Sequence, residues 1–152
     1  MFSNRDILVA GAAAVATISV VAVAAHTNKP AALTSSVFDW EKIAAAATKY
    51  GAKREVVKAP TATLDQLDIH ITTVNPGQRA HDPHRHPDEE IIIVKEGTIE
   101  SMQEGATTKL GPGSIIFEAS NQLHGVANAG DTPATYFVIK FWPPGTLVEK
   151  SN

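Results

Sequence analysis

Two histidines separated by one residue, His84 and His86, stand shortly before a glutamate, Glu90. Residues two apart in an extended chain point to the same side, so both imidazoles can face one site. Glu90 can return to that site after the turn at Pro87. Imidazole nitrogens and carboxylate oxygens are common ligands of divalent transition ions. This spacing therefore predicts three corners of a metal site.

A fourth ligand is expected from His124, in the segment NQLHGVAN. This histidine begins a later predicted strand, and neighbouring strands bring distant parts of a sequence together. Three neutral imidazoles and one carboxylate suit Fe, Mn, Ni or Zn as divalent ions, and an octahedral ion keeps open positions for water, substrate or dioxygen. The sequence has no cysteine, which disfavours a thiolate zinc site. We expect one divalent transition metal per chain.

The order of these residues resembles the two sequence motifs of the cupin superfamily. The first motif has a glycine, H-x-H, a glutamate and a second glycine, which match Gly77, His84, His86, Glu90 and Gly97. The second has a glycine, a histidine and an asparagine, which match Gly113, His124 and Asn128. The resemblance covers roughly residues 67–141, about half of the chain. It implies an all-β fold, a single jelly-roll β-barrel with the three histidines and Glu90 as metal ligands.

The match departs from the family pattern in its turns. One additional residue separates Gly77 from His84, and Ala119 and Asn121 stand where the second motif prefers proline and glycine. Because none of these departures changes a ligand, they concern loop geometry rather than metal binding.

Candidate catalytic residues carry a weaker signal than the candidate ligands. Glu118, Gln122 and His70 could reach the cavity, although each also fits an ordinary strand or surface position. Two classes of function fit the sequence. One is a metal-dependent enzyme, an oxygenase of dioxygenase type, an isomerase or a lyase, acting on a small oxygenated molecule. The alternative is a non-catalytic protein that binds metal or a small ligand.

Short β segments must position these groups. Apolar residues alternate or cluster between turn residues, which predicts strands over residues 67–72, 91–94, 98–102, 107–110, 114–117, 123–127 and 134–141. Residues 39–47 fit either a short helix capped by Asp39 or an extended segment. The run 91–94 lacks polar alternation, so we expect burial on both faces. Its cover would be a second sheet, the segment around Phe38 and Trp40, or the partner in a homodimer.

The N-terminal residues are typical of a targeting segment. An uncharged run over residues 7–25, rich in Ala and Val, closes on Ala22-Val23-Ala24, the small-x-small pattern that signal peptidase accepts. The run is also long enough to cross a bilayer, so a helical membrane anchor is the alternative. We expect an exported protein, periplasmic or secreted. A membrane is a partner only if the segment is uncleaved.

The chain of 152 residues therefore divides into five expected parts. They are a signal peptide or membrane anchor (1–24), a linker (25–36), an N-terminal extension packing on the barrel (37–66), the β-barrel (67–145) and a C-terminal tail (146–152). The net charge is −3 and no basic stripe is present, which argues against nucleic acid as a partner. The expected partners are a small molecule at the metal and a second copy of the chain in a homodimer.

Overall fold

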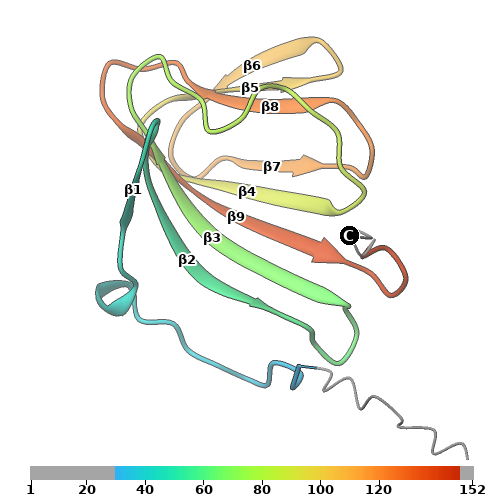
Figure 1. Cartoon of the computed structure of the whole chain (residues 1–152). Coiled ribbons are helices and arrows are strands. Elements are labelled where there is room, and N and C mark those ends of the chain that lie inside the picture. Colours follow the sequence, from blue (N-terminus) through green and yellow to red (C-terminus); the bar gives the residue numbers. More distant parts are fainter. Residues whose placement is uncertain (1–29, 148–152) are drawn as a thin grey trace, which may run out of the picture.

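The computed structural model describes residues 30–147, which form an all-β fold of two antiparallel sheets that face each other (Figure 1). The expected signal or anchor segment lies outside the described residues. Among residues 30–147, no helix has the length and apolar character needed to cross a membrane. The short 3-10 helix η1 (Trp40–Lys42) precedes the first strand.

One sheet has six strands and the other three. In spatial order the larger sheet contains β1 (Ala46–Thr48), β2 (Gly51–Ala59), β3 (Gln66–Val74), β9 (Ala134–Trp142), β4 (Glu89–Glu96) and β7 (Ile115–Glu118). The smaller sheet contains β6 (Ala106–Leu110), β5 (Ile99–Gln103) and β8 (His124–Asn128). Every strand expected from residue 67 onward is present.

The region before residue 67 contributes two strands to the larger sheet. Asp39 caps η1, because its side chain accepts a hydrogen bond from the Glu41 amide at 3.1 Å. The helix ends at Lys42, and residues 46–48 are extended as β1. The extended alternative is therefore correct for this part of residues 39–47, and the chain continues into β2.

The core lies between the sheets and is built from alternate residues of each strand. On β4, Ile92 and Val94 are each 2% exposed, whereas Ile91 and Ile93 are only half-buried. The expectation that this run is buried on both faces is wrong for the single chain. Trp40, one of the expected covers, lies against part of this face: its ring centroid is 6.3 Å from that of Phe137, which is opposite Ile93, and 4.6 Å from Nζ of Lys95.

A row of charged side chains crosses the inner face of the larger sheet. Strand register places these residues directly opposite one another, and such pairs share a face. Across β2, β3, β9, β4 and β7, the row comprises Lys58, Asp68, Lys140, Glu90 and Glu118. We call these five residues the charged row. One member, Glu90, is an expected metal ligand, and Lys140 and Glu118 lie opposite it on either side.

Two motif residues outside the ligand set have structural roles. Gly97 has a φ of 81°, and a Cβ atom there would lie 2.6 Å from the Ala134 Cα, so glycine is required. Asn128 is 3% exposed, and its Nδ2 donates to the carbonyls of Val74 and Thr132 at 2.8 Å each. Asn128 thereby fastens the end of β8 to β3.

Candidate metal centre

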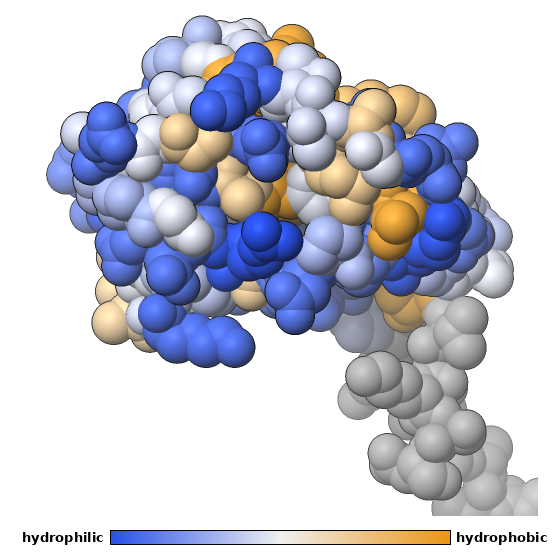
Figure 2. All heavy atoms as spheres, turned by 90° about the horizontal axis from the view of Figure 1, so that it is seen from above, coloured by the Kyte–Doolittle hydropathy of each residue, from blue (hydrophilic) through white to orange (hydrophobic). Residues whose placement is uncertain are grey.

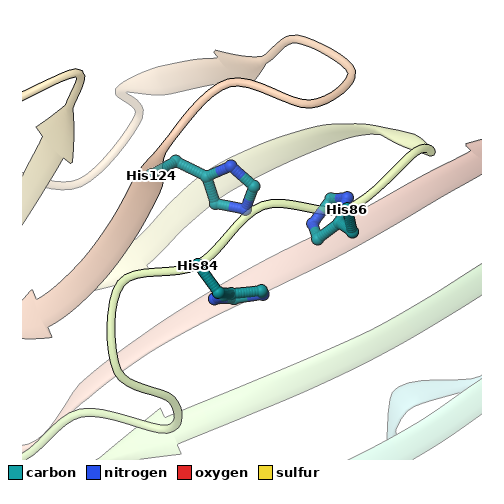
Figure 3. Close-up of side chains that lie close together, drawn as sticks. All are labelled: His84, His86 and His124. Atoms are coloured by element: carbon teal, nitrogen blue, oxygen red, sulfur yellow. The ribbon is translucent and has the colours of Figure 1, made fainter.

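Three of the four expected ligands form one cluster (Figure 3). His84 and His86 come from the loop before β4, and His124 begins β8. Ligand atoms of the three imidazoles all lie within 4.8 Å of one another. The ring centroids of His86 and His124 are 4.5 Å apart. The two motifs therefore meet at one point between the sheets.

Main-chain carbonyl groups orient all three imidazoles. The Nδ1 atoms of His84, His86 and His124 lie 3.0, 3.0 and 2.9 Å from the carbonyl oxygens of Asp82, Asp88 and Gln122. Because a carbonyl oxygen only accepts hydrogen bonds, each Nδ1 carries the hydrogen. In a neutral ring the lone pair is then on Nε2, as metal-binding histidines require.

The buried Nε2 atoms provide a test of whether an ion fits. The Nε2 atoms of His86 and His124 are both buried; that of His124 has no polar partner, and that of His86 lies 3.4 Å from the Glu90 carboxylate. Buried polar atoms are rarely left without a partner. A divalent ion bound by these nitrogens would satisfy both, and the nitrogen donors suit Fe, Mn, Ni or Zn. The residues present therefore fit a transition ion.

Arg85, between the two loop histidines, points away from the cluster and fixes the loop. Its guanidinium donates to both carboxylate oxygens of Glu104, at 2.9 and 3.2 Å, and to the Asn121 carbonyl at 2.7 Å. Asn121 has a φ of 59°, a left-handed conformation that asparagine tolerates better than most residues. This explains how asparagine replaces the glycine of the family pattern.

Glu90 lies next to the cluster. Its Oε2 is 3.4 Å from Nε2 of His86 and 3.2 Å from Nζ of Lys140. Burial opposes ionisation, but hydrogen bonding to His86 and the charge of Lys140 lower the pKa of Glu90. The side chain is therefore a carboxylate, paired with a lysine on one side and adjacent to the histidines on the other.

Asp88 is also part of the site. It is only 2% exposed, with Oδ1 3.0 Å from Nδ1 of His86 and Oδ2 3.3 Å from Nζ of Lys140. Burial opposes protonation of His86, yet hydrogen bonds to Asp88 and Glu90 raise the pKa of His86 to about 9. In the metal-free protein this imidazole is protonated at neutral pH, so ion binding would release a proton.

The three candidate catalytic residues have different environments. His70 lines the same cavity as the histidine cluster. Glu118 is 2% exposed, opposite Glu90 in the charged row, and does not line the cavity. Burial, together with the charge of Glu90, raises the pKa of Glu118 to about 7. The side chain of Gln122 is exposed and lies outside the cavity.

The cavity beside the cluster has a volume of about 620 Å³. Figure 2 shows that hydrophilic side chains dominate the surface seen from above, with apolar side chains in the recess between them. The wall combines apolar groups with hydroxyl, amine and imidazole groups, among them Tyr50, Ile92, Tyr136, Val138, Lys140 and His81. Such a cavity can hold a small polar molecule against the metal centre.

Comparisons with known proteins agree with this fold. A family described as "Cupin domain" matches residues 70–140. The structure is similar to an RmlC-like cupin from Shewanella frigidimarina, with 16% identity, a TM-score of 0.58, and coverage of 75% of this chain and 97% of that chain. It is also similar to KdgF from Halomonas sp., with 20% identity, a TM-score of 0.60, and coverage of 75% and 100%.

A third similar structure is the polyketide cyclase RemF from Streptomyces resistomycificus. The identity is 20%, the TM-score is 0.59, and the match covers 78% of this chain and 89% of that chain. No curated protein matches the sequence. At these identities the structural likeness establishes the fold and not the activity. Taken with the paired motifs and the two facing sheets, the family match shows that the chain belongs to the cupin superfamily.

Proposed function

We propose that the protein binds one divalent transition ion through His84, His86, His124 and Glu90 and acts enzymatically on a small oxygenated molecule. The convergence of three imidazoles, with the Nε2 atoms of His86 and His124 buried and that of His124 without a polar partner, supports this proposal. A bound ion of this kind polarises oxygen atoms of a substrate or activates dioxygen. The expected reaction classes are oxygenase, isomerase and lyase.

The chain's own residues would bind and orient the substrate. Burial opposes ionisation, but hydrogen bonds to His86, together with the charge of Lys140, lower the pKa of Glu90 and Asp88 and keep both carboxylates ionised beside the cluster. Ile92 and Val138 form a dry wall behind them, each less than 5% exposed. Polar groups at the opposite side of the cavity can contact the substrate away from the ion.

The second candidate function is non-catalytic binding of a metal or small ligand. This function is supported by the positions of the three candidate catalytic residues. His70 lines the cavity, whereas Glu118 and Gln122 lie outside it. An enzyme that transfers protons needs such a group within reach of its substrate.

Metal analysis of the purified chain tests the proposal. We expect close to one transition ion per chain and loss of that ion in a variant with alanine at all four ligand positions. Retention of stoichiometric metal in this variant would refute the site. An oxygen-consumption screen of the loaded protein with catechols, flavonoids and small oxo-acids then separates a dioxygenase from a binding protein.

We also propose export, which the apolar run over residues 7–25 supports. N-terminal sequencing of the native product should begin at Ala25 or within a few residues of it. Recovery of only the full-length chain, in the membrane fraction, would support the anchored alternative instead.

A further inference from the structure

A second polar group faces the cavity, away from the histidine cluster. His70 and Asp68 lie on the inner face of β3, with His70 Nδ1 3.0 Å from Asp68 Oδ1. Their side chains are 12% and 10% exposed, and both line the cavity that contains His84, His86 and His124. The cavity therefore has two differently built histidine sites.

The bond to Asp68 determines what His70 offers to a ligand. Burial opposes ionisation of Asp68, but the hydrogen bond from His70 and the nearby lysines lower its pKa, so the side chain is a carboxylate. The carboxylate accepts the hydrogen of Nδ1, which leaves Nε2 of a neutral His70 as an acceptor. This atom is not among the fully buried ones, and the His70 side chain lines the cavity.

Strand register gives the separation between the two sites. Asp68 on β3 is opposite Lys140 on β9, and Lys140 is opposite Glu90 on β4. Two strand spacings correspond to about 10 Å. His70 is also outside the histidine cluster, whose ligand atoms lie within 4.8 Å of one another, but it can contact the far end of a molecule whose near end binds that ion.

A second metal ion is a poorer occupant of this position. Glu55, Asp68 and His70 are close enough to share an ion. However, Nζ of Lys53 lies 2.7 Å from the Glu55 carboxylate, and Nζ of Lys58 lies 3.8 Å from that of Asp68. The two ammonium groups already neutralise these carboxylates and would repel a divalent cation.

We propose that Asp68 and His70 form a second anchor, which accepts a hydrogen bond from a distal hydroxyl group of a hydroxylated carboxylic acid whose carboxylate end binds the ion. The lysines and the hydroxyl groups of Tyr50 and Thr72 line the same region and can bind further hydroxyl groups. The proposal rests on the proposed metal site, and it specifies the ligand by the separation of its two polar ends.

Calorimetric titration of the zinc-loaded full chain with gluconate and glycolate tests the second anchor. Both acids present a carboxylate and an α-hydroxyl group to the ion, but only gluconate has distal hydroxyl groups. We expect the wild type to bind gluconate more tightly. His70→Phe and Asp68→Asn should each weaken gluconate binding about fivefold to tenfold, the effect of one polar contact, and leave glycolate binding unchanged.

Glu100→Gln is the matched control for Asp68→Asn, because it changes a carboxylate to an amide on the smaller sheet, outside the cavity. It should alter neither affinity. Equal binding of the two acids by the wild type, or equal losses for both acids in His70→Phe, would overturn the second anchor. If His70→Phe does not fold, Asp68→Asn decides the matter. A wild type that retains no zinc would instead refute the metal site itself.

Discussion

His84 and His124 each donate a main-chain hydrogen bond to the other's carbonyl oxygen, at 3.0 and 3.1 Å. This isolated antiparallel bridge joins the loop before β4 to the start of β8. It holds the two cupin motifs together through backbone atoms, so the approach of the motifs does not depend on the imidazoles. Metal binding and folding can therefore be separated by mutation.

His84→Ala should weaken metal binding by at least about tenfold while leaving the stability of the metal-free chain within about 0.5 kcal/mol. The side chain is exposed, and the main-chain bridge remains. Metal titration and denaturant unfolding provide the two measurements. His81→Ala, at a cavity-lining histidine outside the cluster, should keep its metal. A large loss of metal-free stability in His84→Ala would contradict this separation.

Lys140→Met should increase metal affinity and decrease the stability of the metal-free protein. Nζ of Lys140 lies 3.2 Å from Glu90, so its charge repels a divalent ion and competes for the carboxylate. Without the lysine, the buried carboxylates of Asp88 and Glu90 lose one charged partner and keep His86 until an ion binds. Thermal unfolding with and without zinc should show a larger stabilisation by zinc than in the wild type.

Lys58→Met is the control for this effect, because Lys58 stands at the opposite end of the charged row. It should change zinc affinity much less. Equal zinc affinities for wild type and Lys140→Met would show that the lysine does not compete with the ion.

Glu118→Gln should change how the stability of the metal-free protein depends on pH. The folded protein holds the Glu118 proton up to about pH 7, whereas the unfolded chain releases it near the ordinary pKa of 4.5. Between these values the native state binds more protons, so the free energy of unfolding falls by about 1.4 kcal/mol per pH unit. Glutamine cannot ionise, and this fall should disappear from the variant.

Denaturant unfolding of both proteins from pH 4 to pH 8 measures the difference. The variant should gain stability over the wild type as the pH rises through this window, with the difference complete above about pH 7. Parallel curves for the two proteins would mean that Glu118 ionises at its ordinary pKa.

Asn128→Ala should destabilise the protein by about 2–3 kcal/mol, because it leaves buried backbone groups without their hydrogen-bond partners. Asn75→Ala is the matched control, since that side chain is exposed. Both free energies of unfolding can be obtained from denaturant titrations. A loss below 0.5 kcal/mol for Asn128→Ala would show that water replaces the lost bonds.

We propose a homodimer that covers the outer face of the larger sheet. On the edge strand β7, Ile115 and Phe117 are 68% and 54% exposed. Strand register continues this face over the half-buried Ile91 and Ile93 of β4, as far as Phe137 of β9, which packs against Trp40. An exposed apolar area of this kind marks an association surface. Light scattering of the wild type should give a dimer mass.

The double variant Ile115→Glu and Phe117→Glu should give a monomer at micromolar concentration, because charges would be buried in the interface. Thr107→Glu on the exposed strand β6, outside the depression that Ile115 and Phe117 line, provides the control and should remain dimeric. A wild-type monomer mass across a hundredfold dilution series would refute the dimer.

The strands that the sequence predicted well are those whose apolar residues face the core. The β3 segment alternates apolar and polar residues, and β4 and β9 are rich in branched and aromatic residues. By contrast, β2 was missed because charged residues, among them Lys53 and Glu55, occupy its inner face and line or flank a polar cavity instead of the core. Periodicity detects a core face more readily than a polar one.

Only part of the metal centre could be predicted from the sequence. The histidine cluster could be predicted because the motif spacing is local to two short segments. The roles of Asp88 and Lys140 could not, because their pairing follows from the register between β4 and β9. The burial of Asp88 likewise depends on the tertiary fold. Its position two residues after His86 does not predict that burial.

The carbonyl groups that orient His84, His86 and His124 belong to the main chain, and any amino acid at those positions supplies the same acceptor. Most side-chain replacements in the cavity wall should therefore leave the orientation of the imidazoles unchanged. Directed evolution of the wall on β2, β3 and β9 should therefore change ligand preference while the metal-binding geometry persists. The protein offers a scaffold in which new specificities can be selected without rebuilding the centre.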